Sequence, residues 1–311
     1  MSKAFEYSDG SKRFLTLDWE LKKLFGKKVV KIPLDLGLGC PNRDGTKGVG
    51  GCTFCSEFRS GEFSGDMRLS LAEQFDETKK LYSKWPDALY IAYFQAGTNT
   101  YAPVHKLKRL FNEALSLPDV VGLSISTRPD CISDEIADML AELSKKTYLT
   151  VELGLQSAKN ATLARINRGH TYEEFLAGYN KLVSRDVKVC IHIINGLPGE
   201  TKQDMLETAK QVAKLSPYEI KIHLLHIISG TKMADEFAAG EFDVMSFEDY
   251  VNTVCDQLEM LPPETVVARL TGDGDRKTLI APDWSRDKRK VLNEIDKELR
   301  RRDSQQGKSH P

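Results

Sequence analysis

Short apolar runs alternate with longer segments of helical periodicity along most of the chain. Runs rich in β-branched and aromatic residues predict strands over 29–36, 88–94, 120–126, 147–154, 187–194 and 219–227. Apolar positions three and four residues apart predict helices over 70–84, 103–116, 133–144, 159–183 with a break near Gly169, 201–214 and 246–260. Six strand–helix units in succession predict a parallel sheet, either open and doubly wound or curled into a partial barrel.

Polar residues alternate with apolar ones in several of these strands, whereas buried parallel strands are usually apolar throughout. Successive side chains on a strand point to opposite faces, so we expect the polar sets to share one space. The interior of a closed eight-stranded barrel is apolar. The pattern therefore favours an α/β fold with a wider, partial (β/α)6 TIM-type barrel of parallel strands. The polar sets are Ser124 and Ser126; Thr150, Glu152, Gly154 and Gln156; Lys188, Cys190 and His192; and Glu219, Lys221 and His223.

Short extensions flank the predicted barrel. We predict an N-terminal basic helical extension over 1–28, the barrel over 29–262 and a C-terminal segment over 263–311. The last is expected to hold a strand at 264–270, a basic helix from Trp284 and a disordered tail, DSQQGKSHP. Residues 1–31 and 285–302 each contain eight Lys or Arg and four Asp or Glu. These basic flanks are interpreted either as solvated helix faces or as a rim that binds a polyanion.

Composition limits the class of protein. The chain has 311 residues, 41% of them hydrophobic, and no apolar run long enough to cross a bilayer. It has no charged and apolar leader, so we expect a soluble, cytoplasmic protein without a membrane partner. A net charge of −1 argues against a protein that coats nucleic acid by bulk charge. Six cysteines in the reducing cytosol do not predict a disulfide framework.

Three of the cysteines lie in one glycine-rich stretch, LDLGLGCPNRDGTKGVGGCTFCSEF, which follows the first strand. Only Cys52 and Cys55 have a two-residue gap, and Cys40 lies upstream. A structural zinc site takes four ligands, so zinc would have to borrow His105 or His170 here. Three thiolates on a four-iron cluster instead leave one iron open to an outside ligand, which is a catalytic arrangement. The loop also falls at the carboxyl edge of the strands, where barrels of this type place their chemistry.

These cysteines and the motifs that follow them resemble the radical S-adenosylmethionine (SAM) superfamily. The similarity covers about residues 30–275, in the branch with the elongator catalytic subunit and the oxygen-independent coproporphyrinogen oxidase, and is closest to the YhcC/YtqA-type proteins. It implies that Cys40, Cys52 and Cys55 bind a [4Fe–4S] cluster, with Phe54 as the aromatic residue before the last ligand. It also implies SAM as a second cofactor, its reductive cleavage to a 5′-deoxyadenosyl radical, and an electron donor such as flavodoxin or ferredoxin.

The resemblance extends to SAM-binding motifs in the family's order. QAGTNTY resembles the turn that binds the methionyl amine, which implies a role for Ala96, Gly97 and Thr98, with Ala96 replacing a usual glycine. STRPD resembles the end of strand three, and Ser126 stands where relatives carry a carboxylate.

Two later motifs complete the implied SAM site. ELGLQS and INRGH imply Gln156 and Arg168 as ligands of the ribose and carboxylate. HIINGLPGET implies that His192 stands in place of a ribose-binding Asp, and that Ile194 packs on the adenine.

Three hypotheses for function follow. The first is a tRNA-modifying radical SAM enzyme that acts on the wobble uridine, as relatives in this branch do, with tRNA bound through the basic flanks. The second is a radical SAM enzyme acting on a small metabolite. The third is a non-enzymatic iron–sulfur or zinc protein that senses redox state or metal.

Three further residues are candidates for chemistry near the active edge. Cys131 is expected near the end of strand three, where a hydrogen-atom donor could lie, although a packed thiol is the favoured interpretation. His223 and His226 lie three residues apart on one predicted strand, so we expect them to point to opposite faces and not to share an ion.

Overall fold

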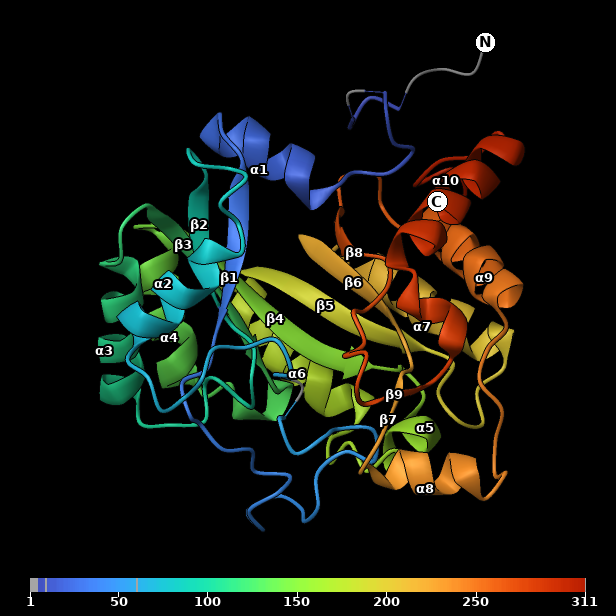
Figure 1. Ribbon diagram of the computed structural model, residues 1–311, viewed down its shortest axis with the longest axis horizontal. Helices are drawn as coiled ribbons and strands as arrows, with labels where there is room; N and C mark the ends of the chain where they lie inside the picture. The colour runs from blue at the N-terminus through green and yellow to red at the C-terminus, as the bar shows by residue number, and fades with distance from the viewer. Residues whose placement is uncertain (1–4, 9, 60, 311) are drawn as a thin grey trace.

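A curved, seven-stranded sheet forms the centre of the computed structural model, which describes residues 5–8, 10–59 and 61–310 (Figure 1). Every neighbouring pair of its strands is parallel. The sheet curls into a half-barrel, so the predicted α/β partial barrel is confirmed. In spatial order the strands are β1 (Val29–Leu34), β2 (Leu89–Phe94), β3 (Val120–Thr127), β4 (Tyr148–Gln156), β5 (Lys188–Asn195), β6 (Glu219–Leu224) and β8 (Val266–Arg269).

Helices cover the convex face of the sheet and bury its apolar side chains. The predicted break near Gly169 is confirmed: α5 ends at Arg165 and α6 begins at Tyr172. Gly169 has φ +73°, and a Cβ there would lie 2.4 Å from Asn42 Oδ1, so the chain turns tightly against the cysteine loop. The helices are α2 (Leu71–Lys80), α3 (Val104–Leu115), α4 (Asp134–Ser144), α5 (Asn160–Arg165), α6 (Tyr172–Val183), α7 (Lys202–Leu215), α9 (Phe247–Met260) and α10 (Lys288–Arg301).

The region after β6 differs from the prediction. β6 ends at Leu224, three residues earlier than expected, and the chain then leaves the sheet. A short antiparallel pair follows, β7 (Ile227–Ile228) with β9 (Leu279–Ala281), and the helix α8 (Lys232–Ala238) lies between them in sequence. Strands of two or three residues are too short to give a periodic signal.

The N-terminal segment closes the outer edge of the sheet. Thr16 forms a parallel bridge with Val267 of β8, and the backbone oxygen of Leu15 accepts from Val267 N at 2.7 Å. Directly after this bridge, α1 (Leu17–Phe25) leads into β1, the strand at the opposite edge.

The tail after α10 is ordered over the residues that the structure describes, contrary to the prediction of disorder. Gln306 is 1% exposed. Its side chain accepts from Leu15 N at 2.9 Å and donates to the backbone oxygens of Pro262 and Thr265 at 2.7 and 2.8 Å. A buried amide that satisfies three backbone groups fixes the tail despite its polar composition. Pro311 lies outside the described residues.

The two basic flanks pack on each other. Lys12 forms an ion pair with Asp296 of α10 at 2.5 Å, and Arg300 donates to the backbone oxygen of Ser11 at 2.9 Å. Over the described residues, the helices are too short or too polar to cross a bilayer.

Candidate active site

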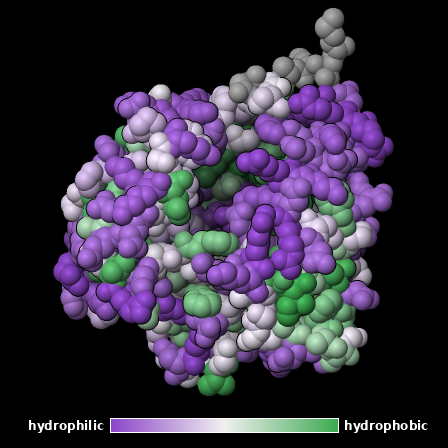
Figure 2. Space-filling view, in the orientation of Figure 1, coloured by the Kyte–Doolittle hydropathy of each residue, from purple (hydrophilic) through white to green (hydrophobic). Residues whose placement is uncertain are grey.

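A cavity of about 1250 Å³ occupies the lumen of the half-barrel and extends to the loops that follow the strands. In Figure 2 this cavity appears as a hollow near the centre of the face that Figure 1 also presents. The polar sets predicted from strand alternation contribute Ser126, Glu152, His192, Lys221 and His223 to its lining. The expectation of a polar lumen is therefore confirmed.

Eleven of the twelve site residues predicted from the sequence line this one cavity. The exception is Ala96, which is fully buried, and a Cβ at Gly61 would lie 2.5 Å from its Cβ. Ala96 is thus packed against Gly61 and does not itself line the cavity. The eleven are Cys40, Cys52, Phe54, Cys55, Gly97, Thr98, Ser126, Gln156, Arg168, His192 and Ile194.

Two arginines hold the shape of the cysteine loop, residues 35–58: Arg43 lies inside it and Arg59 directly follows it. Neither was predicted from the sequence. Arg59 donates to the backbone oxygen of Leu38 and pairs with Asp35 at 2.9 Å. Arg43 donates to the backbone oxygen of Cys55 at 2.8 Å. Because a guanidinium offers several donors in a fixed plane, it can satisfy carbonyls from separate parts of a loop. Basic residues inside a glycine-rich, cysteine-bearing segment were the signal available in the sequence.

The sulfur of Cys52 has two N–H donors. Asn42 Nδ2 lies 3.8 Å and Arg168 Nη1 lies 3.6 Å from its Sγ. Arg128, which is 3% exposed, donates to the backbone oxygen of Arg168 at 2.8 Å and makes a two-point ion pair with Asp130. N–H donors beside a ligand atom orient it for metal binding.

The cysteines fit a cluster better than a single zinc ion. Among the described residues the cysteines form no disulfide, and the sulfurs of Cys40, Cys52 and Cys55 do not all lie within 4.8 Å of one another. Two sulfurs on one zinc, at about 2.3 Å each, lie within about 4.6 Å of each other. His170 directs both ring nitrogens at backbone oxygens, and His105 lies exposed on α3 outside the cavity. Neither histidine is placed to complete a zinc site.

Two glycines allow close packing in the cavity wall. A Cβ at Gly97, whose φ is +74°, would lie 2.6 Å from the backbone oxygen of Leu38. A Cβ at Gly154 would lie 2.6 Å from both Arg168 Nη2 and Gln156 Nε2. Gln156 itself has φ +78°, which turns its side chain at the end of β4. These two glycines therefore let the backbone pack closely on its neighbours at the cavity wall.

A buried ion network forms the floor of the cavity. The Glu152 side chain is fully buried and contacts Lys31 Nζ at 3.0 Å and Lys221 Nζ at 2.5 Å. Lys31 also lies 3.6 Å from Glu219. Together these lysines and the glutamates Glu152 and Glu219 carry two positive and two negative charges. The ammonium groups hold the pKa of Glu152 well below its usual range, although burial alone would raise it.

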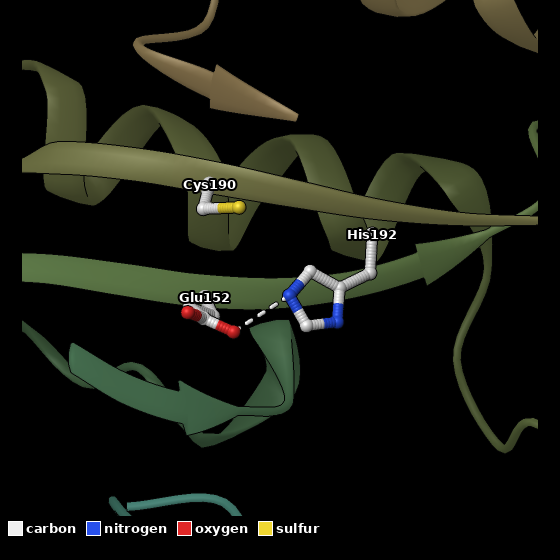
Figure 3. Close-up of side chains that lie close together, drawn as sticks. All are labelled: Glu152, Cys190 and His192. Carbon is white, nitrogen blue, oxygen red and sulfur yellow. Dashed lines mark hydrogen bonds and ion pairs between the residues drawn. The ribbon is translucent and has the colours of Figure 1, made fainter. Parts of the chain in front are cut away.

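His192 and Ser126 both contact the carboxylate of Glu152. His192 Nε2 lies 2.8 Å from one oxygen (Figure 3), and Ser126 Oγ donates to the same oxygen at 3.3 Å. Burial lowers the pKa of His192 to about 4, against the opposing effect of this hydrogen bond. Since the neutral ring must donate to a carboxylate, Nε2 carries the proton and Nδ1 is the acceptor.

Among the described residues, Glu152, Cys190 and His192 are the one group of three metal-type ligands whose atoms lie within 4.8 Å. Burial and the nearby Glu219 carboxylate raise the pKa of Cys190 well above its usual value, so its thiol is neutral. Glu152 is already neutralised by lysine. We therefore interpret this group as part of the buried network.

One expectation about single residues changes, and another agrees with the structure. His223 and His226 both line the cavity, so the prediction of opposite faces is wrong. The reason is that His226 lies beyond the end of β6, where strand alternation no longer applies. Cys131 does not line the cavity, and burial raises the pKa of its thiol to about 12, which agrees with a packed side chain.

A parallel half-barrel with three cysteines at its carboxyl edge, and a large cavity beside them, defines a barrel that holds a metal cluster next to a second cofactor. The profile of the Radical SAM superfamily matches residues 36–212, and that of the Radical_SAM C-terminal domain matches residues 217–301. The chain belongs to the radical SAM superfamily. Its cofactors are accordingly a [4Fe–4S] cluster and SAM, and its chemistry is that of a radical SAM enzyme.

Comparisons with individual proteins agree with this family. The chain is 52% identical to the uncharacterized protein YtqA of Bacillus subtilis over 305 residues, covering 98% of this chain and 95% of that protein. It is 29% identical to the tRNA uridine(34) acetyltransferase of Methanocaldococcus infernus over 157 residues, 49% of this chain and 29% of that one. The structure of the M. infernus Elp3 with an N-terminal deletion has the same fold, with a TM-score of 0.65 at 17% identity, covering 89% of this chain and 64% of that one.

Proposed function

We propose that this radical SAM enzyme modifies the side chain of the wobble uridine of tRNA. The observation that carries the proposal is the charge of the cavity, which is lined by eleven Lys or Arg and six Asp or Glu in a chain of net charge −1. A basic opening attracts and steers a polyanion. The partial similarity to a tRNA uridine(34) acetyltransferase supports the same nucleotide as the target.

We propose that Cys40, Cys52 and Cys55 hold the cluster, and that the remaining iron binds SAM. When both are bound and an electron arrives from a donor such as flavodoxin or ferredoxin, they supply a 5′-deoxyadenosyl radical that removes a hydrogen atom from the substrate. In the structure, Asn42 and Arg168 donate hydrogen bonds to the Cys52 sulfur. Such hydrogen bonds tune the reduction potential of a cluster.

The SAM contacts that we propose follow the edge of the sheet from β2 to β5. The methionyl amine meets Gly97 and Thr98, which follow the buried Ala96 in the same turn, and the carboxylate and ribose meet Arg168 and Gln156. His192 accepts from a ribose hydroxyl through Nδ1, with Glu152 fixing its tautomer, and Ser126 contributes its hydroxyl nearby. Ile194 packs on the adenine, and Phe54 packs beside it, since both contact the apolar cluster around Leu225.

A nucleobase in tRNA would have to leave its stack to enter this cavity. Enzymes that perform chemistry on a base extrude it into a pocket and compensate for the lost stacking with contacts of their own. The loop at 272–277 and the start of α10 line the mouth and contribute Arg276, Lys277 and Lys288, which would meet the RNA backbone.

The first experiment tests the chemistry. Protein reconstituted anaerobically and reduced is incubated with SAM, and 5′-deoxyadenosine is measured by chromatography. We expect product from the wild type and none from the triple variant Cys40/Cys52/Cys55→Ala, while Cys131→Ala, which removes a thiol outside the cavity, keeps the activity. No product from the wild type, with four irons bound and undermodified tRNA present, would refute the proposal and favour a metal or redox sensor.

The second experiment tests the substrate. Undermodified tRNA is incubated with the loaded enzyme, and its nucleosides are measured by mass spectrometry at several salt concentrations. We expect a mass change at the wobble uridine and binding that weakens linearly in log–log form with salt. Arg276→Gln/Lys277→Gln should weaken binding, whereas Lys210→Gln/Lys214→Gln on α7, outside the cavity, should not. If tRNA binding does not depend on salt concentration and the nucleosides are unchanged, the hypothesis of a small-metabolite substrate would be favoured instead.

A further inference from the structure

One wall of the cavity is not used by the proposed SAM site. It is formed by the end of β6, the residues just after it, β8, and the start of α10. Its basic side chains are His223, His226, Arg269 and Lys288, all of which line the cavity, and we call them the basic wall. β8 is the edge strand opposite β1, from which the cysteine loop emerges. The basic wall and the cysteine loop therefore belong to opposite edges of the sheet and line one cavity.

The basic wall has fewer acidic partners than cations. Asp273 contacts Lys288 Nζ at 2.6 Å and lies 3.7 Å from Arg269 Nη2. The Asp273 carboxylate thus pairs with both Arg269 and Lys288. The nearby Lys221 already pairs with Glu152. Burial, together with Arg269, lowers the pKa of Lys288, although Asp273 raises it. An excess of positive charge in a partly desolvated wall favours an anionic ligand.

Two imidazoles in the basic wall have unused hydrogen-bonding atoms. His223 Nε2 and His226 Nε2 are buried and have no hydrogen-bond partner. The ring of His223 lies against that of His192, with centroids 5.1 Å apart. Burial lowers the pKa of both His223 and His226, so they are neutral and each can donate one N–H. Buried polar atoms without partners call for an explanation, and a bound ligand supplies one.

A glycine turn closes over these imidazoles. A Cβ at Gly272 would lie 3.2 Å from His226 Cε1 and 3.9 Å from His223 Nδ1. A Cβ at Gly274 would lie 3.3 Å from His226 Nδ1. Any side chain at these positions would crowd the rings. The turn that carries Asp273 is therefore shaped to bring both histidines and the two cations together in a small volume.

We propose that the basic wall binds an anionic group of the substrate, a carboxylate or a phosphate, through Arg269, Lys288 and the two histidines. The assignment rests on the proposed function, because it concerns the substrate of the same radical site. Arg269 offers the paired N–H geometry that matches either oxyanion, and His223 and His226 add neutral donors. An anion held here would orient the rest of the substrate toward the cysteine loop.

The test uses the protein without cofactors or RNA. Protein labelled with ¹⁵N at histidine is titrated with N-acetylglycine, as a carboxylate probe, or with inorganic phosphate, and sodium chloride at matched ionic strength is the reference. We expect saturable shifts of the Nε2 resonances of His223 and His226, assigned with His223→Gln and His226→Gln. The probe that saturates at lower concentration identifies the anion class. No shift beyond the chloride reference for either probe would overturn the proposal.

Matched variants test the cations. Arg269→Gln should weaken binding of the preferred probe by about tenfold, the loss expected for one charged hydrogen bond. Arg289→Gln removes the same charge from an exposed position of α10 outside the cavity and should bind as the wild type does. Equal binding by the two variants, both confirmed as folded by circular dichroism, would overturn the proposal.

Failure of this inference is distinguishable from failure of the tRNA proposal. Probe binding with no change in tRNA nucleosides would reject the RNA substrate and keep the anion site. Normal modification of tRNA by Arg269→Gln, with unchanged KM and kcat, would reject the anion site and keep the RNA substrate.

Discussion

Substitution of Glu152 by glutamine would remove one charge from the floor of the cavity without changing the shape of the side chain. In the wild type, Glu152 lies 3.0 Å from Lys31 and 2.5 Å from Lys221. After the change, Lys31 still has Glu219 at 3.6 Å. Lys221, whose side chain is 4% exposed, keeps only the hydroxyl of Tyr93, at 3.0 Å. The substitution therefore leaves one buried ammonium group without a counter-charge.

The expected cost follows from that single orphaned charge. Removing one partner of a buried ion pair costs about 3–5 kcal/mol. The new amide can still accept from Ser124, which donates to Glu152 at 2.6 Å. We expect Glu152→Gln to lower the free energy of unfolding by about 3 kcal/mol at pH 7.5. The double variant Glu152→Gln/Lys221→Met should recover part of this loss, because it removes the orphaned charge.

Urea denaturation followed by circular dichroism measures the effect. The control is Glu142→Gln, since Glu142 forms an exposed ion pair with Lys108 at 3.4 Å; an exposed pair should contribute about 0.5 kcal/mol or less. A loss in Glu152→Gln no larger than in this control would refute the account of the buried network.

The pH dependence gives a second check. The folded-state pKa of Glu152 lies well below its usual value, so its contribution is present above about pH 4.3 and disappears as pH falls through the folded pKa. The difference between wild type and Glu152→Gln should therefore shrink in strong acid, where the wild-type carboxylate is also protonated.

Three further outcomes are expected. Gly97→Ala should weaken SAM binding in calorimetry and destabilise the fold by about 1–3 kcal/mol, because Gly97 has φ +74° and an added Cβ would lie 2.6 Å from a backbone oxygen. The control is Gly39→Ala, because an added Cβ there has no atom closer than 4.0 Å. Equal effects of the two substitutions would contradict this prediction. Burial lowers the pKa of His192 and His226 to about 4, so the folded state binds fewer protons than the unfolded chain. The free energy of unfolding should therefore decrease as the pH is lowered from about 6.5 to about 4. A free energy of unfolding that does not change over this range would argue against neutral buried rings. Gln306→Ala should cost about 2 kcal/mol, since it leaves buried backbone groups unpaired, and a cost equal to that of Gln305→Ala, which is half-buried, would contradict the role of the tail.

The strands were predictable because hydrophobic periodicity is a local signal. The alternation of Glu152, Gly154 and Gln156 on β4 predicted a polar lumen, and the cavity lining confirms it. The same rule failed at His226, because alternation applies only while the chain stays in a strand, and the end of β6 depends on tertiary packing. The assignment of individual residues to SAM stays a prediction.

Several features of the site depend on contacts between distant segments. Arg128 and Arg168 meet near the Cys52 sulfur from loops that follow β3 and α5. Gln306 is buried only because Leu15 and the segment after α9 supply backbone partners. Neither arrangement has a signature in the spacing of residues, since each depends on which chain segments the fold brings together.

The passage of the N-terminal segment from β8 to β1 has a mechanical consequence. Leu15 and Thr16 are bonded to β8, and the chain then runs through α1 directly into β1. The two edges of the half-barrel are thus joined at the amino ends of the strands, whereas at the carboxyl ends the cysteine loop meets α8 through the hydrogen bond from Met233 N to the backbone oxygen of Thr53. The half-barrel is therefore held closed near α1. Any widening to admit a bulky substrate would be greatest at the cysteine loop and smallest at α1, so a disulfide or crosslink near α1 should leave substrate entry unaffected.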